Sequence, residues 1–270
     1  MSSSSTFLAT QGEGYERTMW RWSRQLALPF LDFVGTADGN RVLDVCCGTG
    51  HLAFAVARRS GAGEVRGIDL AQPYIEHARR HNQDPRIVFD VADACALPFP
   101  ERSFDRVLSL LVLHFVPKAD QAIAEMLRVT RPGGVVAAAV WDARGGFVAN
   151  RMFFDTAAAL DPKAGERRAR NYTRPLTRPG ELQRAWLNAG LKNVVETTLV
   201  MRMEFASFAD YWTPYEGNEG PGAEYVASLS EVERGHLRDA VQAAYLDGDE
   251  DGPRSYAALA WAVKGTRPVT

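Results

Sequence analysis

The chain has 270 residues, 46% of them hydrophobic and 24% charged, with a formal net charge of −2 at pH 7. This length and composition are typical of a globular protein with a large core, which one domain can contain. The near-neutral charge argues against a large nucleic-acid or anionic-membrane interface, so we expect no nucleic-acid partner.

The start of the chain and its cysteines predict where the protein works. Residues 1–14 are serine-rich and predict a disordered N-terminus without the basic and apolar regions of a signal peptide. No stretch approaches the roughly 20 apolar residues that span a bilayer, so no integral membrane segment is expected. Cys46, Cys47 and Cys95 lack metal-binding spacing and a suitable disulfide geometry, which predicts reduced thiols and a cytoplasmic location.

The sequence RVLDVCCGTGHLA predicts a strand, a tight turn and a helix. Arg41–Val45 is short and β-branched, as in a buried strand, and Leu52 begins a helical apolar period. The small residues Cys46–Gly50 allow the turn between them. A helix that begins behind glycines presents free N–H groups, which suit a polar or anionic ligand.

Two ligand classes use such a turn. The dinucleotide fingerprint G-x-G-x-x-G is not met, because Cys46 and His51 stand at its first and third glycine positions. The other pattern is an acid in the strand followed by glycines at every second position. Asp44, Gly48 and Gly50 fit this pattern, with Cys46 where glycine is usual. A carboxylate at Asp44 favours a cationic group, which a pyrophosphate does not have.

Three further signals follow in order. Val65–Asp69 predicts a second strand that ends in an acid beside the glycine turn. A carboxylate there can accept from both hydroxyls of a ribose, although a helix N-cap would also explain it. Arg86–Val91 predicts a third strand, followed by the phrase D-A-x-x-LPF from Asp93. Arg131–Gly134, R-P-G-G, predicts the turn before a fifth strand.

In this order, these signals resemble the class I S-adenosylmethionine (AdoMet)-dependent methyltransferases, especially the small-molecule type 11 branch that includes quinone-biosynthesis enzymes. The resemblance is strong over residues 41–142 and topological beyond them. It implies an α/β fold: a Rossmann-like seven-stranded sheet, six strands parallel and the last antiparallel, with helices on both faces. Residues 15–270 would form this domain, with 206–255 as a helical lid or substrate insertion. Extra core or an oligomer contact, as in a homodimer, is the alternative for 206–255.

The resemblance also implies how the cofactor is bound. Asp69 would hold the ribose and Leu70 would lie against the adenine. Asp93 and the Ala94 N–H would read the adenine edge, and the backbone near Leu110 would accept from the cofactor amino group. The residues implied in binding AdoMet, or its product S-adenosylhomocysteine, are Asp44, Cys46, Gly48, Gly50, Asp69, Leu70, Asp93, Ala94 and Leu110.

An aromatic helical stretch from about Tyr15 to Val34 precedes the first strand. A helix packed on the sheet explains most of its apolar residues. Because relatives of this fold often close the site with an N-terminal helix, Tyr15 and Arg24 are further cofactor-binding candidates. Arg24 would pair with the cofactor carboxylate.

The acceptor site is expected at the carboxyl ends of the fourth and fifth strands. His114 follows the predicted strand Phe104–Leu111 and is the candidate general base, with a capping or packing histidine as the alternative. Trp141 and Asp142 end the fifth strand and, with Trp212, are the candidate substrate-binding residues.

No metal site is expected. His77 and His81 lie one helical turn apart on an arginine-rich face, which predicts a solvated surface. Asp247–Gly252 imitates the start of a calcium loop, but position 12 is Ala258 rather than glutamate.

The other elements expected are helices over Pro73–His81, Ala119–Val129, Arg151–Leu160, Arg178–Ala189 and Ser230–Leu246, with strands over Val135–Val140, Lys192–Phe205 and Tyr256–Lys264. The expected activity is methyl transfer from AdoMet to O, C or N of a small aromatic or lipophilic acceptor. The alternatives are an AdoMet-binding protein without methyl transfer and a dinucleotide-dependent oxidoreductase.

Overall fold

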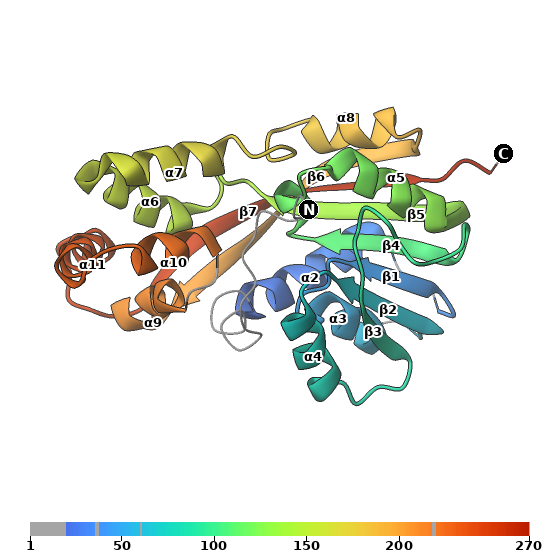
Figure 1. Ribbon diagram of the computed structural model, residues 1–270, viewed down its shortest axis with the longest axis horizontal. Helices are drawn as coiled ribbons and strands as arrows, with labels where there is room; N and C mark the ends of the chain where they lie inside the picture. Colours follow the sequence, from blue (N-terminus) through green and yellow to red (C-terminus); the bar gives the residue numbers. More distant parts are fainter. Residues whose placement is uncertain (1–19, 36–37, 60, 218–219, 270) are drawn as a thin grey trace.

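The computed structural model describes residues 20–35, 38–59, 61–217 and 220–269, so Tyr15 and the segment 1–14 lie outside the described residues. Within these ranges seven strands form one sheet in the order β3-β2-β1-β4-β5-β7-β6 (Figure 1). The strands are β1 Arg41–Val45, β2 Glu64–Asp69, β3 Ile87–Val91, β4 Phe104–Leu110, β5 Thr130–Trp141, β6 Lys192–Phe205 and β7 Arg254–Thr266.

The pairing confirms the predicted topology. Strand β1 pairs in parallel with β2 and β4, and the parallel ladder continues to β3 on one side and β5 on the other. Strand β7 is antiparallel to both of its neighbours, β5 and β6. The parallel strands β1 and β4 are buried almost throughout, as expected for strands that are covered on both faces of the sheet.

Helices cover both faces of the sheet (Figure 1). One core packs α2, α3 and α4 against the sheet, and a second core on the opposite face packs α5 and α8. The helices are α2 Trp20–Val34, α3 His51–Arg59, α4 Gln72–His81, α5 Ala119–Val129, α6 Val148–Leu160, α7 Pro162–Tyr172, α8 Glu181–Asn188, α9 Phe208–Trp212, α10 Gly220–Ala227 and α11 Glu231–Leu246, with short 3-10 turns η1 Leu113–Phe115 and η2 Thr213–Glu216.

The R-P-G-G segment is a bulge inside β5 rather than a turn before it. Thr130 pairs with Phe104, and the ladder resumes at Val135 opposite Arg106. Gly134 lies so close to the neighbouring strand that a Cβ would come within 2.9 Å of the Asp105 carbonyl oxygen. The glycine therefore lets the bulge fold back against β4.

The long hairpin of β6 and β7 extends beyond β5 and carries a second lobe. Pairing of β5 with β7 stops at Trp141 and Ala260, whereas β6 and β7 stay paired as far as Phe205 and Arg254. Helices α6, α7, α9, α10 and α11 gather around this extension (Figure 1). Their buried aromatic residues include Phe153, Phe208, Tyr211, Trp212 and Tyr245. Residues 206–255 supply four of these buried aromatic side chains, and their expected role as a lid or substrate insertion stays a prediction.

The surface predicted around His77 needs correction. His77 is buried and stacks on His81 with ring centroids 4.1 Å apart, so the face predicted to be solvated turns inward at His77. The charged run after Asp161 forms α7, which buries Ala164 and Asn171 and leaves most of its charged residues toward solvent. Throughout the described ranges, each helix is too short or too polar to cross a bilayer.

Candidate functional site

The turn between β1 and α3 has a left-handed backbone at every second residue. Cys46, Gly48 and Gly50 have φ values of 60°, 55° and 93°. Glycine adopts this conformation without a steric penalty, which explains why the sequence pattern asks for glycine at alternate positions. Cys46 adopts it despite its Cβ, at a cost of about 1–2 kcal/mol.

Replacing Cys46 tests this reading of the turn. Cys46→Gly relieves the left-handed strain but gives the unfolded chain more freedom, so we expect the free energy of unfolding to change by less than about 1 kcal/mol. Cys46→Val places a β-branched side chain at φ +60° and should destabilise the protein by more than 1 kcal/mol, as a rough figure. Urea unfolding of the two variants measures the difference, and equal stabilities would contradict the assignment.

Asp44, in β1, lies beneath this turn. Its side chain is 1% exposed, and its Oδ2 accepts from the Ala53 N–H of α3 at 3.1 Å. Burial raises the pKa of Asp44 from 3.8 to about 8, and the nearby Asp69 charge adds to the rise. A cationic ligand group beside Asp44 would relieve this like-charge repulsion and favour the carboxylate.

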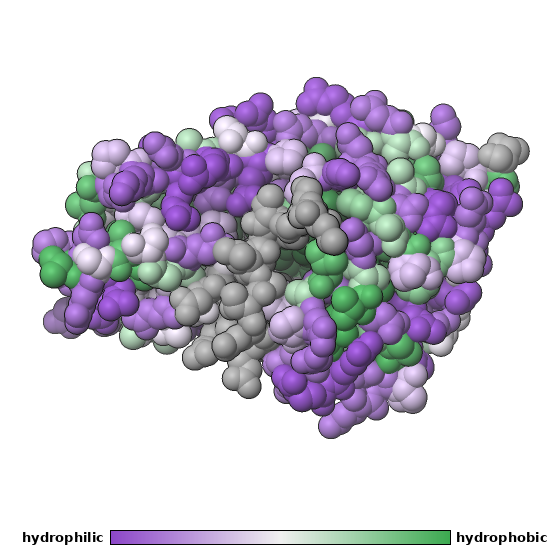
Figure 2. Space-filling model, in the orientation of Figure 1, coloured by the Kyte–Doolittle hydropathy of each residue, from purple (hydrophilic) through white to green (hydrophobic). Residues whose placement is uncertain are grey.

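Asp69 ends β2 on the other side of the turn. Its Oδ2 accepts from the Gly48 N–H at 2.9 Å, and its Oδ1 accepts from the Ala71 N–H at 2.9 Å. Burial raises its pKa, an effect that these backbone hydrogen bonds oppose. The structure thus brings the two predicted acids to the same turn. Leu70, the next residue, is exposed. Figure 2 shows a cluster of hydrophobic residues just right of the centre of one face, with smaller hydrophobic areas elsewhere on it.

Thr49 was missed by sequence reasoning. It lies between the two glycines of the turn, its side chain is 2% exposed, and its hydroxyl oxygen has no hydrogen-bond partner among the described residues. A buried hydroxyl without a partner is unfavourable unless a ligand or water completes it. Its place inside the glycine pattern is the signal that could have identified it.

The predicted adenine-reading residues follow β3 in an irregular turn. The Asp93 Oδ1 accepts from the Cys95 N–H at 2.8 Å, which fixes the carboxylate to its own turn. Ala94 is buried beside it. At the end of β4, Leu110 is buried and Leu111 has φ +67°, with its N–H donating to the Ala139 carbonyl of β5 at 2.7 Å. The carboxyl ends of the parallel strands β1, β2, β3 and β4 therefore lie along the same edge of the sheet.

His114 lies in η1, just past β4. Its side chain is 5% exposed, and its Nδ1 has no hydrogen-bond partner within the described ranges. Burial, and to a smaller extent the positive charge of Arg174, lower its pKa to about 3. The imidazole is therefore neutral near pH 7 and, in this state, a weaker base than an exposed histidine. Its assignment as a general base stays a prediction.

The three residues predicted to bind the methyl acceptor lie in three different environments. Trp141, at the end of β5, stacks on Phe147 with ring centroids 4.7 Å apart, and its indole N–H has no partner among the described side chains and backbone groups. The Asp142 Oδ1 accepts from backbone N–H groups two and three residues later, so it shapes the turn after β5. Trp212 is 2% exposed and donates to Glu216 Oε1 at 2.8 Å, inside the core of the second lobe.

Arg24 is exposed on α2. Its neighbour Arg21 instead pairs with Asp210 of α9 at 3.0 Å, which ties α2 to the second lobe. The cofactor role predicted for Arg24 stays a prediction, and that of Tyr15 falls outside the described residues.

Comparison with known proteins agrees with these motifs. Residues 42–134 match a family described as a methyltransferase domain. Over 105 residues the chain is 41% identical to Methyltransferase GfsG of Streptomyces halstedii, an alignment that covers 37% of either chain. Over 108 residues it is 40% identical to the demethylmenaquinone methyltransferase of Lysinibacillus sphaericus, covering 39% of this chain and 46% of that protein. The matched segment spans less than half the length of these curated relatives.

The fold is similar to that of Haemonchus contortus phosphoethanolamine N-methyltransferase 2, solved with phosphomonomethylethanolamine and S-adenosylhomocysteine. The TM-score is 0.60 at 18% identity, over 95% of this chain and 57% of that chain. At this identity the likeness concerns the fold alone. Over residues 42–134, which run from β1 to the start of β5, the chain is therefore similar to a methyltransferase domain.

Proposed function

We propose that the chain binds AdoMet over the carboxyl ends of β1 to β4 and transfers its methyl group to a small molecule. The observation that carries this proposal is the pair of buried acids beside one glycine turn: Asp69 accepts from the Gly48 N–H of the turn, and Asp44 accepts from the Ala53 N–H of the helix that follows it. AdoMet carries a cationic methionine end and a ribose, which are the two groups that these acids suit. The unpartnered Thr49 hydroxyl supplies a further hydrogen-bonding group in the same turn.

Each side chain then has a definite task. Asp69 would accept from the ribose hydroxyls while keeping its bonds to the turn, since a carboxylate has about four acceptor positions. Asp44 would face the positive end of the cofactor. Asp93 and Ala94 would hold the adenine edge. When bound, AdoMet supplies a methyl group that its sulfonium already makes electrophilic.

The protein therefore needs chiefly to align an acceptor and exclude water, which can lower the barrier by several kcal/mol, an order-of-magnitude figure. The aromatic side chains Trp141, Phe147 and Phe115 near the carboxyl edge favour an aromatic or lipophilic acceptor. His114 would remove a proton where the acceptor atom carries one, and a ligand oxygen that accepts from a ring N–H would raise its low pKa. An acceptor oxygen, carbon or nitrogen suits this arrangement.

We further propose that the second lobe, including residues 206–255, closes over the acceptor, and that the protein acts in the cytoplasm. Its three cysteines are unpaired, and burial raises the pKa of the Cys46 and Cys47 thiols, which keeps them protonated. Such thiols suit a reducing compartment. A homodimer remains a prediction, which sedimentation of the full chain measures.

Radiolabelled methyl transfer tests the activity. The chain is incubated with methyl-labelled AdoMet and a panel of phenols, quinones and amines, and the label is followed into the organic product. We expect label in at least one acceptor and none with Asp69→Ala. Tight AdoMet binding without transfer to any acceptor would favour an AdoMet-binding protein without methyl transfer.

A further inference from the structure

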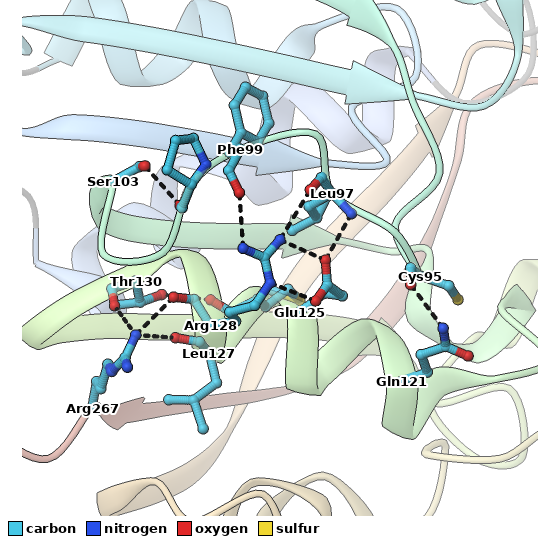
Figure 3. A network of polar contacts seen from close by, with 12 residues as sticks. Cys95, Leu97, Phe99, Ser103, Gln121, Glu125, Leu127, Arg128, Thr130 and Arg267 are labelled. Atoms are coloured by element: carbon cyan, nitrogen blue, oxygen red, sulfur yellow. Dashed lines mark hydrogen bonds and ion pairs between the residues drawn. The ribbon is translucent and has the colours of Figure 1, made fainter.

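The turn that carries Asp93 and Ala94 has little regular structure of its own. Residues 92–103 lie between β3 and β4 without helix or strand. A buried backbone of this kind must find hydrogen-bond partners outside itself. Figure 3 shows that helix α5 supplies them through its side chains.

Two side chains of α5, Arg128 and Glu125, bind the backbone of this turn at Leu97 and Phe99. The Arg128 guanidinium donates to the Leu97 carbonyl at 2.9 Å and to the Phe99 carbonyl at 2.8 Å. Glu125 accepts from the Leu97 N–H at 2.8 Å and also pairs with Arg128 at 2.7 Å. Both backbone groups of Leu97 are therefore held by one ion pair (Figure 3).

A third side chain holds the middle of the turn. Gln121, one helical turn before Glu125, donates to the Cys95 carbonyl at 2.9 Å. The Cys95 N–H in turn donates to Asp93 at 2.8 Å. Cys95 thus connects Gln121 of α5 with the Asp93 carboxylate through two hydrogen bonds.

We infer that Arg128 and Glu125 are positioning residues that set the affinity and base selectivity of the adenine end of the cofactor site. This inference rests on the proposed function. The planar guanidinium donates to two carbonyls in a fixed geometry while it pairs with Glu125, which a single ammonium group cannot reproduce. Without it, two carbonyls lose their partners and the turn loses the anchor that keeps Asp93 in place.

Arg267, the residue after β7, provides a matched control that contacts the same helix. Its guanidinium donates to the carbonyls of Leu127, Arg128 and Thr130, at 3.0, 2.7 and 2.7 Å. It therefore holds the carboxyl end of α5 but does not contact the turn after β3 (Figure 3). A variant at Arg267 loses stability from the same region of the fold without loosening Asp93.

The experiment measures binding of S-adenosylhomocysteine and of S-inosylhomocysteine, in which oxygen replaces the exocyclic amine. Calorimetry is carried out below the unfolding temperature of every variant. We expect Arg128→Gln to raise the Kd for S-adenosylhomocysteine about tenfold and to reduce the preference for adenine over hypoxanthine by a similar factor. Arg128→Lys should recover part of both effects, and Arg267→Gln should change neither.

The possible outcomes distinguish failure of the proposed function from failure of the positioning role of Arg128 and Glu125. If the wild-type chain binds neither ligand, the proposed function is wrong and this inference falls with it. If the wild type binds and prefers adenine but Arg128→Gln keeps the same preference, only the positioning role is overturned. An equal loss of preference in Arg267→Gln would also overturn it, because the effect would then reflect general destabilisation of α5.

Discussion

Replacing Asp69 by alanine is expected to weaken AdoMet binding by at least about 100-fold. The variant would lose two hydrogen bonds from ribose hydroxyls to a charged acceptor, each worth about 1.5–3 kcal/mol. It would also release the Gly48 and Ala71 N–H groups that Asp69 now accepts, and so loosen the glycine turn. Isothermal titration calorimetry of both proteins measures the change in Kd.

Asp90 provides the control for this substitution. It lies on the next strand, β3, and its exposed carboxylate pairs with Arg66 at 3.4 Å and with Arg79 at 3.2 Å. Because exposed ion pairs of this kind contribute at most about 1 kcal/mol, Asp90→Ala should leave the Kd within about twofold of the wild type. Undiminished AdoMet affinity in a folded Asp69→Ala variant would refute the ribose assignment.

Replacing Asp44 by asparagine is expected to stabilise the unliganded protein near pH 7 by about 4 kcal/mol, because each pH unit above the unfolded pKa of 3.8 costs the folded protein about 1.4 kcal/mol. The pKa of Asp44 is raised from 3.8 to about 8 by burial, so its folded form holds a proton that the unfolded chain releases above pH 4. The stability that this carboxyl contributes is present below its unfolded pKa and is lost as the pH rises through about 8. An asparagine keeps an acceptor for the Ala53 N–H but does not ionise.

The difference in stability between the two proteins should therefore grow with pH. At pH 4 the wild type and Asp44→Asn should unfold at similar temperatures, and at pH 8 the variant should unfold at a clearly higher one. AdoMet binding should show the opposite dependence, since a cation favours the ionised carboxylate. Wild-type affinity should rise toward pH 8, while that of Asp44→Asn should be weaker and flatter. A stability difference that stays constant from pH 4 to pH 8 would contradict this account.

The first half of the fold could be predicted from sequence because its signals are local. The strand at Arg41–Val45 and the helix at Ala119–Val129 have the predicted boundaries. In the second half, the long strand at Lys192–Phe205 also has its predicted boundaries. The departure from the motif at Cys46, where glycine is usual, also has a local explanation. The backbone of Cys46 has the left-handed conformation that glycine adopts most easily. The sheet order followed from the resemblance of the ordered motifs rather than from periodicity.

The second lobe and the electrostatics of the site could not be predicted in the same way. Its aromatic core joins Phe153, Phe208 and Tyr245, which lie far apart in sequence, so no local pattern separates core from substrate wall. The low pKa of His114 depends on burial and on Arg174, which comes from beyond α7. The anchoring of the Asp93 turn by Arg128 likewise depends on tertiary contacts. An arginine in a helical sequence pattern does not indicate such contacts.

Titration of the wild-type chain with AdoMet and with NADH tests the central claim most directly, namely that two buried carboxylates flank one cationic nucleoside. The account predicts saturable AdoMet binding with one site per chain and no detectable heat from NADH. Binding of NADH with no binding of AdoMet would contradict it. The glycine turn would then be a dinucleotide-binding turn, as in a dinucleotide-dependent oxidoreductase.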